Sequence, residues 1–424
     1  MAAKIMEQAD KHSTLVFFTG TFPYGKSETV IENEFPFLLE AFRNIIVVSN
    51  NQTDPVTRPV PDHVKLMRYR YHTSHLEKLS NSPYLLRSEV REEIDYLHRV
   101  LHKRLGRRVL FNLLGSYSNG LYARRFIHNL MKRYQIAPRH LYLYSYWMYD
   151  VAIGMAMIKR ELPEVKAVCR AHRWDLYYDT NPLHYLPFRK FIVEHLDRCF
   201  VISEHGRMYL QNMLPGADHS KIKTLRLGTI NRHTPVFEPQ PHTFTIVSCS
   251  TLTPQKRVDL IIRSLARLDF PFRWVHFGDG ALRKEIKEMA AAMLGKLPHA
   301  TYEFKGMVPN ATLRRFYEEN TVDVFLNVSD SEGVPISIME ALSYAIPVIA
   351  TDAGGTGEIV QDKVNGTLLP VATDEISVSS ALARYAQAPA EEKLKLRQRA
   401  FNSWNERYNA DKNYREFIRE LKSL

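Results

Sequence analysis

Short apolar segments alternate with amphipathic ones along the second half of the chain, and this alternation limits the folds that are open to it. Apolar runs rich in β-branched and aromatic residues predict strands at 244–250, 273–278, 302–306, 322–328, 347–352 and 366–370. Apolar residues at helical spacing predict helices at 257–268, 282–294 and 310–320. Strands that alternate with helices of this length predict a parallel, doubly wound α/β sheet.

The first half repeats this pattern less regularly. Strands are predicted at 14–20, 44–50, 141–147, 166–172 and 198–204, and a basic, mostly helical insertion is predicted at about 58–133. We expect a Rossmann-like domain at 1–230, a Pro-rich linker at 231–242, a second Rossmann-like domain at 243–405, and a C-terminal helix at 406–424 that crosses back to the first domain. Two such domains would face each other across a cleft, with ligands beyond the carboxyl ends of the strands.

Composition excludes several classes of protein. The 424 residues include no apolar run of about 18, so no membrane-spanning helix is predicted, and the N-terminal residues do not resemble a signal peptide. Cys169, Cys199 and Cys249 are far apart in the sequence and lack C-x-x-C spacing. We therefore expect three reduced cysteines in a cytoplasmic protein, without a disulfide framework or a zinc site.

The positive charge is concentrated in one region. The whole chain carries a formal net charge of +11, and residues 58–133 hold 16 Lys and Arg against 6 Asp and Glu, which is +10. Leucine, tyrosine and phenylalanine residues lie between these charges. Three interpretations remain: a solvated face, a surface for an anionic membrane or a lipid-phosphate acceptor, and a nucleic-acid surface. The last is disfavoured because no nucleic-acid-binding motif accompanies the charge.

Two glutamates occupy the segment "SEGVPISIMEALS" (331–343), which follows the strand predicted at 322–328. Pro335 fits the first turn of a helix, and an apolar stripe follows it. Glu332 would then lie in the loop before the helix, beside backbone N–H groups that attract anions and hydroxyls. Glu340 would lie inside the helix, where a carboxylate can accept two hydrogen bonds from a vicinal diol such as ribose. The alternative is a helix-start charge and a solvated helix residue.

This segment resembles the E-x-seven-E motif of retaining glycosyltransferases with the GT-B fold, in particular glycosyltransferase family 4 (glycosyl transferases group 1). The text at 341–360, "FGDG" at 277–280, "FKGMV" at 304–308 and "RAHRWDLY" at 170–177 is also similar to that family. The resemblance is strong from about 240 to 370 and weak through 55–135. It implies a GT-B fold, in which two Rossmann-like, doubly wound parallel-sheet domains face a cleft.

The resemblance also implies roles for individual residues. Glu332 would hold the donor sugar, Lys256 would neutralise the diphosphate, and His172 would reach the sugar from the other domain; these three form the catalytic set. The implied donor-binding residues are Glu340, Gly333, Val334, Pro335, Thr251, Arg257, Gly278, Met307 and Asp175. The loop that would approach phosphates or the acceptor carries Gly20, Gly25 and Lys26.

Ordinary structural roles compete with these assignments. His172 could end a strand, Lys256 could lie on a surface helix, Asp175 could cap a helix, and the two glycines could serve a turn. The chain also departs from the family, because Thr251 stands where an arginine is usual. Arg257 or Lys26 could compensate for it at the diphosphate.

The chemistry that the resemblance implies is sugar transfer with retention, without a metal and without a cofactor beyond the donor, such as a UDP- or GDP-sugar. "DSE" (330–332) could instead be a metal motif, but its place before an aliphatic stripe favours the metal-free interpretation. The expected acceptor is a glycan or a lipid-linked glycan in bacterial cell-surface polysaccharide synthesis, on the cytoplasmic face of the membrane, and nucleic acid is not an expected partner. The alternatives are another nucleotide-sugar enzyme, such as an epimerase, and an inactive anion-binding partner subunit.

Overall fold

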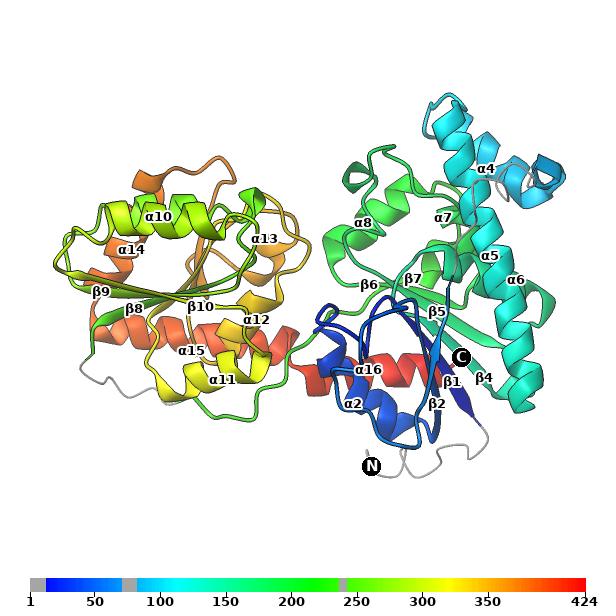
Figure 1. Cartoon of the computed structure of the whole chain (residues 1–424), viewed down its shortest axis with the longest axis horizontal. Coiled ribbons are helices and arrows are strands. Elements are labelled where there is room, and N and C mark those ends of the chain that lie inside the picture. The colour runs from blue at the N-terminus through cyan, green and yellow to red at the C-terminus, as the bar shows by residue number, and fades with distance from the viewer. Residues whose placement is uncertain (1–12, 71–81, 236–241) are drawn as a thin grey trace. The chain divides into compact units, whose positions relative to one another are not determined.

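A computed structural model of the chain describes residues 13–70, 82–235 and 242–424 (Figure 1). The chain forms two compact units. Unit 1 comprises Met1–Arg226 and Tyr414–Leu424, and unit 2 comprises Leu227–Asn413. The last helix therefore belongs mainly to the unit in which the chain begins.

Unit 1 is built on a seven-stranded parallel sheet with the order β3-β2-β1-β4-β5-β6-β7. Its strands are β1 (Thr14–Thr19), β2 (Asn44–Ser49), β3 (Lys65–Arg68), β4 (Leu141–Ser145), β5 (Lys166–Ala171), β6 (Arg198–Val201) and β7 (Ile222–Thr224). The order reverses between β1 and β4, which is the switch point of a doubly wound sheet.

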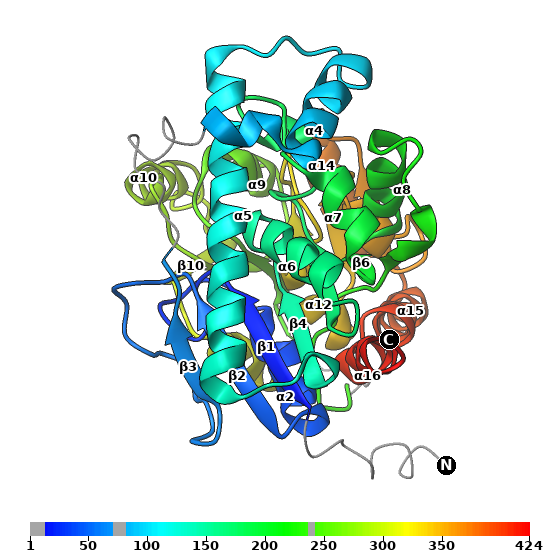
Figure 2. The same ribbon diagram turned by 90° about the vertical axis from the view of Figure 1, so that its right-hand side faces the viewer.

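Helices cover both faces of this sheet. Alternate residues of β1 enter two different cores: Val16 and Phe18 pack with the larger helical layer, and Leu15 and Phe17 pack with α2 and α16. Figure 2 shows the long helix α5 beside α6. The α-helices of unit 1 are α2 (Ile31–Ala41), α4 (Ser88–Arg99), α5 (Arg107–Tyr134), α6 (Asp150–Glu161), α7 (Arg189–His195), α8 (Glu204–Met213) and α16 (Ala410–Lys422).

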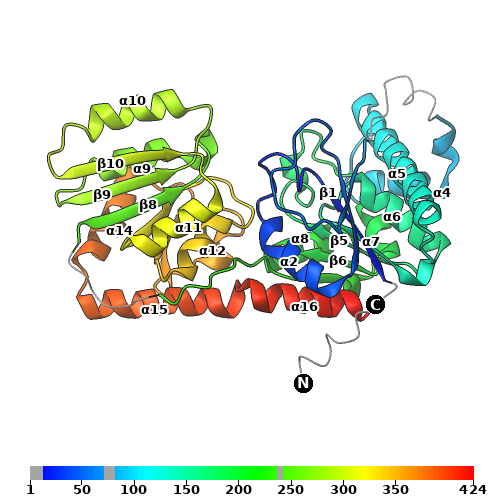
Figure 3. The same cartoon turned by 60° about the horizontal axis from the view of Figure 1, so that its bottom comes forward.

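Unit 2 repeats the design with a six-stranded parallel sheet of order β10-β9-β8-β11-β12-β13, whose switch point lies between β8 and β11. Figure 3 shows β10, β9 and β8 side by side in this sheet. Its strands are β8 (Phe244–Cys249), β9 (Phe272–Phe277), β10 (Ala300–Gly306), β11 (Val324–Asn327), β12 (Val348–Thr351) and β13 (Gly366–Leu369). Its α-helices are α9 (Val258–Leu265), α10 (Arg283–Met293), α11 (Asn310–Glu319), α12 (Ile336–Ser343), α13 (Thr356–Ile359), α14 (Glu375–Gln387) and α15 (Ala390–Arg407). Helices α9, α10 and α14 share one core with the sheet.

These two sheets confirm the predicted parallel, doubly wound fold, but the sequence did not predict β3 or β7. Strand β3 lies inside the basic region that was expected to be mostly helical, and it pairs with β2. Cys169 and Cys199, far apart in the sequence, face each other on β5 and β6 with their Sγ atoms 3.6 Å apart. In the described part of the chain, no helix is both long and apolar enough to cross a membrane.

Candidate functional site at the carboxyl edges of the two sheets

The switch point of unit 2 brings Lys256 and Glu332 together. Lys256 ends the short 3-10 helix after β8, and Glu332 lies in the loop after β11. The Nζ atom of Lys256 lies 2.6 Å from Oε1 of Glu332, and Nδ2 of Asn327 donates to the same oxygen at 3.4 Å. The Asp330 N–H also donates to the Gln255 carbonyl at 3.0 Å. Side chains and backbone thus join the two loops at the edge where such sheets bind ligands.

Glu340 is buried in α12, with 6% of its surface exposed. Burial raises the pKa of the Cys249 thiol to about 12, and the nearby Glu340 carboxylate adds to that rise while Lys256 opposes it. Burial and the charges of Cys249 and Glu340 likewise raise the pKa of Tyr317. Glu340 is therefore a buried carboxylate whose charge acts on Cys249 at the end of β8, and the solvated helix residue considered from the sequence is wrong.

Two glycines with left-handed backbone conformation allow neighbouring loops to approach each other closely at this edge of the sheet. Gly354 has a φ of +56°, and a Cβ atom there would lie 2.0 Å from the carbonyl oxygen of Glu332. Gly278 has a φ of +133°, and a Cβ atom there would lie 1.8 Å from the carbonyl oxygen of Ser250. Any side chain at either position would displace the loop that it touches. Gly354 was not among the predicted site residues, although the pair "GG" after a strand was a usable signal.

The other predicted donor-binding residues of unit 2 lie in several loops of the unit. Gly333 and Val334 continue the Glu332 loop, and Pro335 is the N-cap of α12. Thr251 is exposed, and so is Met307, at 61%. The guanidinium of Arg257 donates to the carbonyls of Val371 and Thr373, at 2.7 and 2.8 Å. These bonds hold Arg257 against the segment after β13, which leaves Lys256 as the cation that pairs with Glu332.

In unit 1, Asp175 is fully buried and links two loops. Its Oδ1 accepts the His172 N–H and its Oδ2 accepts the Met148 N–H, each at 2.7 Å. Burial raises the pKa of Asp175 to about 6, against the effect of these hydrogen bonds. Asp175 thus orients the backbone at His172.

The His172 ring lies against Tyr146 and Trp147, with ring centroids 4.5 and 4.6 Å away. Burial and the charge of Arg170 lower the pKa of His172 well below its usual value, so the imidazole is neutral at pH 7. Among the described residues, neither ring nitrogen has a hydrogen-bond partner. Buried polar atoms usually have a hydrogen-bond partner, so the two ring nitrogens of His172 are exceptions within the described residues.

The loop with Gly20, Gly25 and Lys26 is organised by Glu28, which the sequence analysis missed. Oε2 of Glu28 accepts the N–H groups of Thr21 and Phe22, each at 2.6 Å, and Oε1 accepts the Gly20 N–H at 2.8 Å. Gly25 has a φ of +60°, and Lys26 is exposed. Three consecutive amides that could hold a phosphate therefore hold a carboxylate of the chain.

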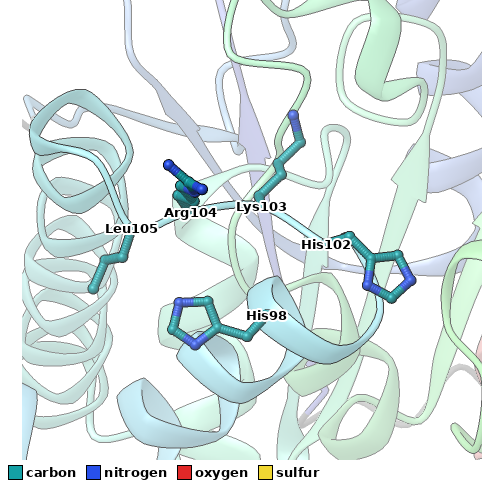
Figure 4. Close-up of a pocket in the computed structure, with 5 residues that line it drawn as sticks. All are labelled: His98, His102, Lys103, Arg104 and Leu105. Atoms are coloured by element: carbon teal, nitrogen blue, oxygen red, sulfur yellow. The ribbon is translucent and has the colours of Figure 1, made fainter.

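The basic region includes a hollow of about 530 Å³ between α4 and α5, lined by His98, His102, Lys103, Arg104 and Leu105 (Figure 4). Helix α5 then begins with Arg107 and Arg108, and no acidic residue lies in its first turn. Phe111 on α5 is 43% exposed, and Leu86 before α4 is 71% exposed. Positive charge at the positive end of a helix dipole favours an anion nearby.

No group of three or more His, Cys, Asp or Glu residues that could hold a metal ion occurs within residues 13–70, 82–235 and 242–424. Glu332 of the "DSE" segment pairs with Lys256. Independence of metal stays a prediction.

Residues 232–403 match the family described as "Glycosyl transferases group 1". Over 252 residues, the chain is 28% identical to the "Putative colanic acid biosynthesis glycosyltransferase WcaL" of Escherichia coli (strain K12), covering 57% of this chain and 59% of that protein. The chain thus spans less than two thirds of this relative's length.

Two solved structures share the fold over nearly the whole chain. The apo form of the lipopolysaccharide outer core galactosyltransferase WaaB has a TM-score of 0.63 and 14% identity, over 96% of this chain and 99% of that one. Anabaena Alr3699/HepE in complex with UDP and glucose has a TM-score of 0.61 and 14% identity, over 97% of this chain and 100% of that one. With the two parallel sheets, these likenesses establish the predicted GT-B fold.

Proposed function

We propose that the protein is a retaining glycosyltransferase of family 4 that moves a sugar from a nucleotide-diphosphate sugar to a glycan acceptor in bacterial cell-surface polysaccharide synthesis. The observation that carries the proposal is the Lys256–Glu332 ion pair at the unit 2 switch point, with Glu340 buried on the helix that follows. The matched family and the relative named for colanic acid biosynthesis support the same activity.

Each group in unit 2 has a chemical task in this proposal. Glu340 accepts hydrogen bonds from the ribose, and the ammonium of Lys256 and the first N–H groups of α12 stabilise the diphosphate as it leaves. Glu332 lies where the anomeric carbon gains positive charge, and its carboxylate stabilises that charge. A UDP-sugar is the first donor to test, because HepE is similar in fold and its structure holds UDP and glucose.

His172 has a separate place in the proposal. Its neutral imidazole has no protein partner within the described chain and can exchange a hydrogen bond with a hydroxyl of the transferred sugar. Asp175 acts as a positioning residue, because it binds the backbone of His172 and not its ring.

We also propose that unit 1 binds reversibly to anionic membrane surfaces through the region that contains Arg104, Arg107 and Arg108. Phe111, which is exposed, lies on α5 three positions after Arg108, so charge and apolar surface occur together at the start of this helix. A lipid-linked glycan acceptor would be presented at such a surface.

A nucleotide panel tests the activity. Calorimetry with UDP, GDP, ADP, CMP and TDP should show one preferred nucleotide, and the corresponding nucleotide sugars should then release it slowly even without acceptor. Failure of all five to bind the intact protein would contradict the proposal. Conversion of the sugar without release of the nucleotide would favour an epimerase instead.

A further inference from the structure

Unit 1 has a pocket of about 320 Å³ at the carboxyl edge of its sheet. Residues at the ends of β1, β2 and β4 line it, among them Thr19, Asn50 and Ser145. These strands include both members of the switch point, where doubly wound sheets bind ligands. The position alone therefore marks it as a binding site within unit 1.

Aromatic side chains form much of the wall of this pocket. Trp147 and Tyr149 stack, with ring centroids 5.9 Å apart and planes 21° apart. Trp174 also lines the pocket, and its residue is 54% exposed. The face of an aromatic ring carries negative partial charge, which attracts the C–H groups on the flat side of a pyranose. The Arg173 guanidinium lies over the Trp174 ring, 5.1 Å from its centroid, and the Trp147 ring packs against Tyr149 and His172. The exposed part of Trp174, beside hydroxyl and amide groups, suits a sugar ring.

The charge of the pocket argues against a phosphate. None of the residues that line it in the described chain is lysine, arginine or histidine, and one of them is Glu28; the nearby Arg173 guanidinium lies over the outer Trp174 ring. The amides of Gly20, Thr21 and Phe22, which could form an anion site, already donate to Glu28. The Nε1–H of Trp147 donates to the same carboxylate. A phosphate here would meet a negative charge and no free row of amides.

We propose that this pocket binds an uncharged sugar ring, the terminal residue of the acceptor glycan, and not a lipid-phosphate or sugar-phosphate group. The proposal rests on the proposed transfer to a glycan, and it replaces the phosphate role expected for the loop with Gly20, Gly25 and Lys26. Any phosphate of a lipid-linked acceptor is then bound elsewhere, and the sugar ring at the end of the glycan away from the phosphate occupies the pocket.

The test uses the full chain without donor. Saturation-transfer NMR would screen the methyl glycosides of glucose, galactose, mannose, N-acetylglucosamine, fucose and rhamnose against glucose 1-phosphate and galactose 1-phosphate. Tryptophan emission would give the affinities, because Trp274 and Trp404 are 0% and 2% exposed and signal changes would come from Trp147 and Trp174. At least one glycoside should bind, and it should bind more tightly than either phosphate.

Variants then locate the binding. Trp174→Ala and Tyr149→Ala should each weaken the bound glycoside about tenfold, which is about 1.4 kcal/mol, and Trp174→Phe should restore most of the affinity. Met208→Ala is the control, since Met208 is half-exposed in unit 1 and does not line the pocket. Binding of none of the glycosides, tighter binding of a phosphate, or equal affinity in all variants would overturn the proposal.

Nucleotide binding distinguishes a failure of this proposal from a failure of the proposed glycosyltransferase function. The Trp174→Ala and Tyr149→Ala variants should bind the preferred nucleoside diphosphate as the wild type does, because neither residue lies in unit 2. If the protein binds a sugar but no nucleotide, the assignment of the pocket is supported and the proposed glycosyltransferase function is contradicted.

Discussion

Lys256 and Glu332 lie 76 positions apart in the sequence, and their Nζ and Oε1 atoms are 2.6 Å apart at the unit 2 switch point. Both side chains are mostly buried, with 23% and 9% exposed. The pair holds a cation beside the start of a helix, where a diphosphate would be stabilised. It also makes the two residues interdependent, because removing either leaves a partly buried charge.

Glu332→Gln should lower kcat more than it raises KM, since the side-chain shape is kept and the charge is lost where positive charge develops. We expect a loss of about 2–4 kcal/mol of transition-state stabilisation. Steady-state kinetics would measure it, with Glu288→Gln on the exposed surface of α10 as the control. The double variant with Lys256→Met should be less impaired than the sum of the single variants. Kinetics like the wild type's would mean that the pair is only structural.

Glu340→Gln should instead raise the donor KM with little effect on kcat. Its proposed contact is to the ribose, and binding to that group is alike in the ground and transition states. The same kinetic series would give both constants for Glu332→Gln and Glu340→Gln. An equal fall in kcat for the two variants would contradict the proposal that Glu340 binds the nucleoside and Glu332 binds the transferred sugar.

Donor turnover should persist in excess chelator, because the proposed diphosphate contacts are an ammonium and backbone N–H groups. Nucleotide release would be followed with and without EDTA, and then after manganese or magnesium is restored. Activity that disappears in chelator and returns with metal would assign Asp330 and Glu332 to a metal site. NMR of the product should also show retention at the anomeric carbon, and an inverted product would exclude the retaining class.

Anionic liposomes should bind the protein at low salt and release it at high salt, since salt screens surface charge. Arg104, Arg107 and Arg108 replaced together by serine should weaken binding by up to about 100-fold, at about 1 kcal/mol for each charge. The control replaces Lys284, Lys287 and Lys296 of unit 2, which removes the same charge from another surface. Equal loss in both triple variants would indicate a net-charge effect and contradict a specific surface.

Glu93 should make stability depend on pH. Burial raises the pKa of its carboxyl from 4.5 to about 7, although Tyr185 and the Phe188 N–H donate to it. Ionisation of a group whose pKa is raised by folding destabilises the folded state. The free energy of unfolding of the wild type should therefore fall by about 3 kcal/mol, relative to that of Glu93→Gln, as the pH rises from 4.5 to 7.

Urea unfolding at several pH values would measure this difference. Glu92→Gln, on the exposed side of the same helix, should follow the wild type at every pH. A constant difference between Glu93→Gln and the wild type across this range would contradict the raised pKa.

The sequence predicted those parts of the molecule that are encoded locally. Strand and helix periodicities identified most of the two sheets, and the segment from Glu332 to Glu340 was correctly placed as a loop and the helix that follows. Strand β3 was missed because "KLMR" is short and only partly buried, so its pattern carries little signal.

Long-range partners were not predictable in the same way. Glu28 binds three amides through a chain reversal, and nothing in its spacing distinguishes it from the other carboxylates nearby. Gly354 is required by the carbonyl of Glu332, which lies on another strand's loop. The contact between Cys169 and Cys199 follows from the register of two parallel strands, which periodicity does not fix.

Helix α16 has a consequence for how the protein is made. Phe417 and Leu421 complete the core that contains Phe17 and Tyr144, yet they follow the whole of unit 2 in the sequence. Unit 2 is continuous and can fold as soon as it emerges from the ribosome, whereas one face of the unit 1 sheet, which α2 covers in part, is not fully covered until α16 has been synthesised. Unit 1 begins before unit 2 in the sequence but is completed after it, and nascent chains stalled before residue 414 should need chaperone protection.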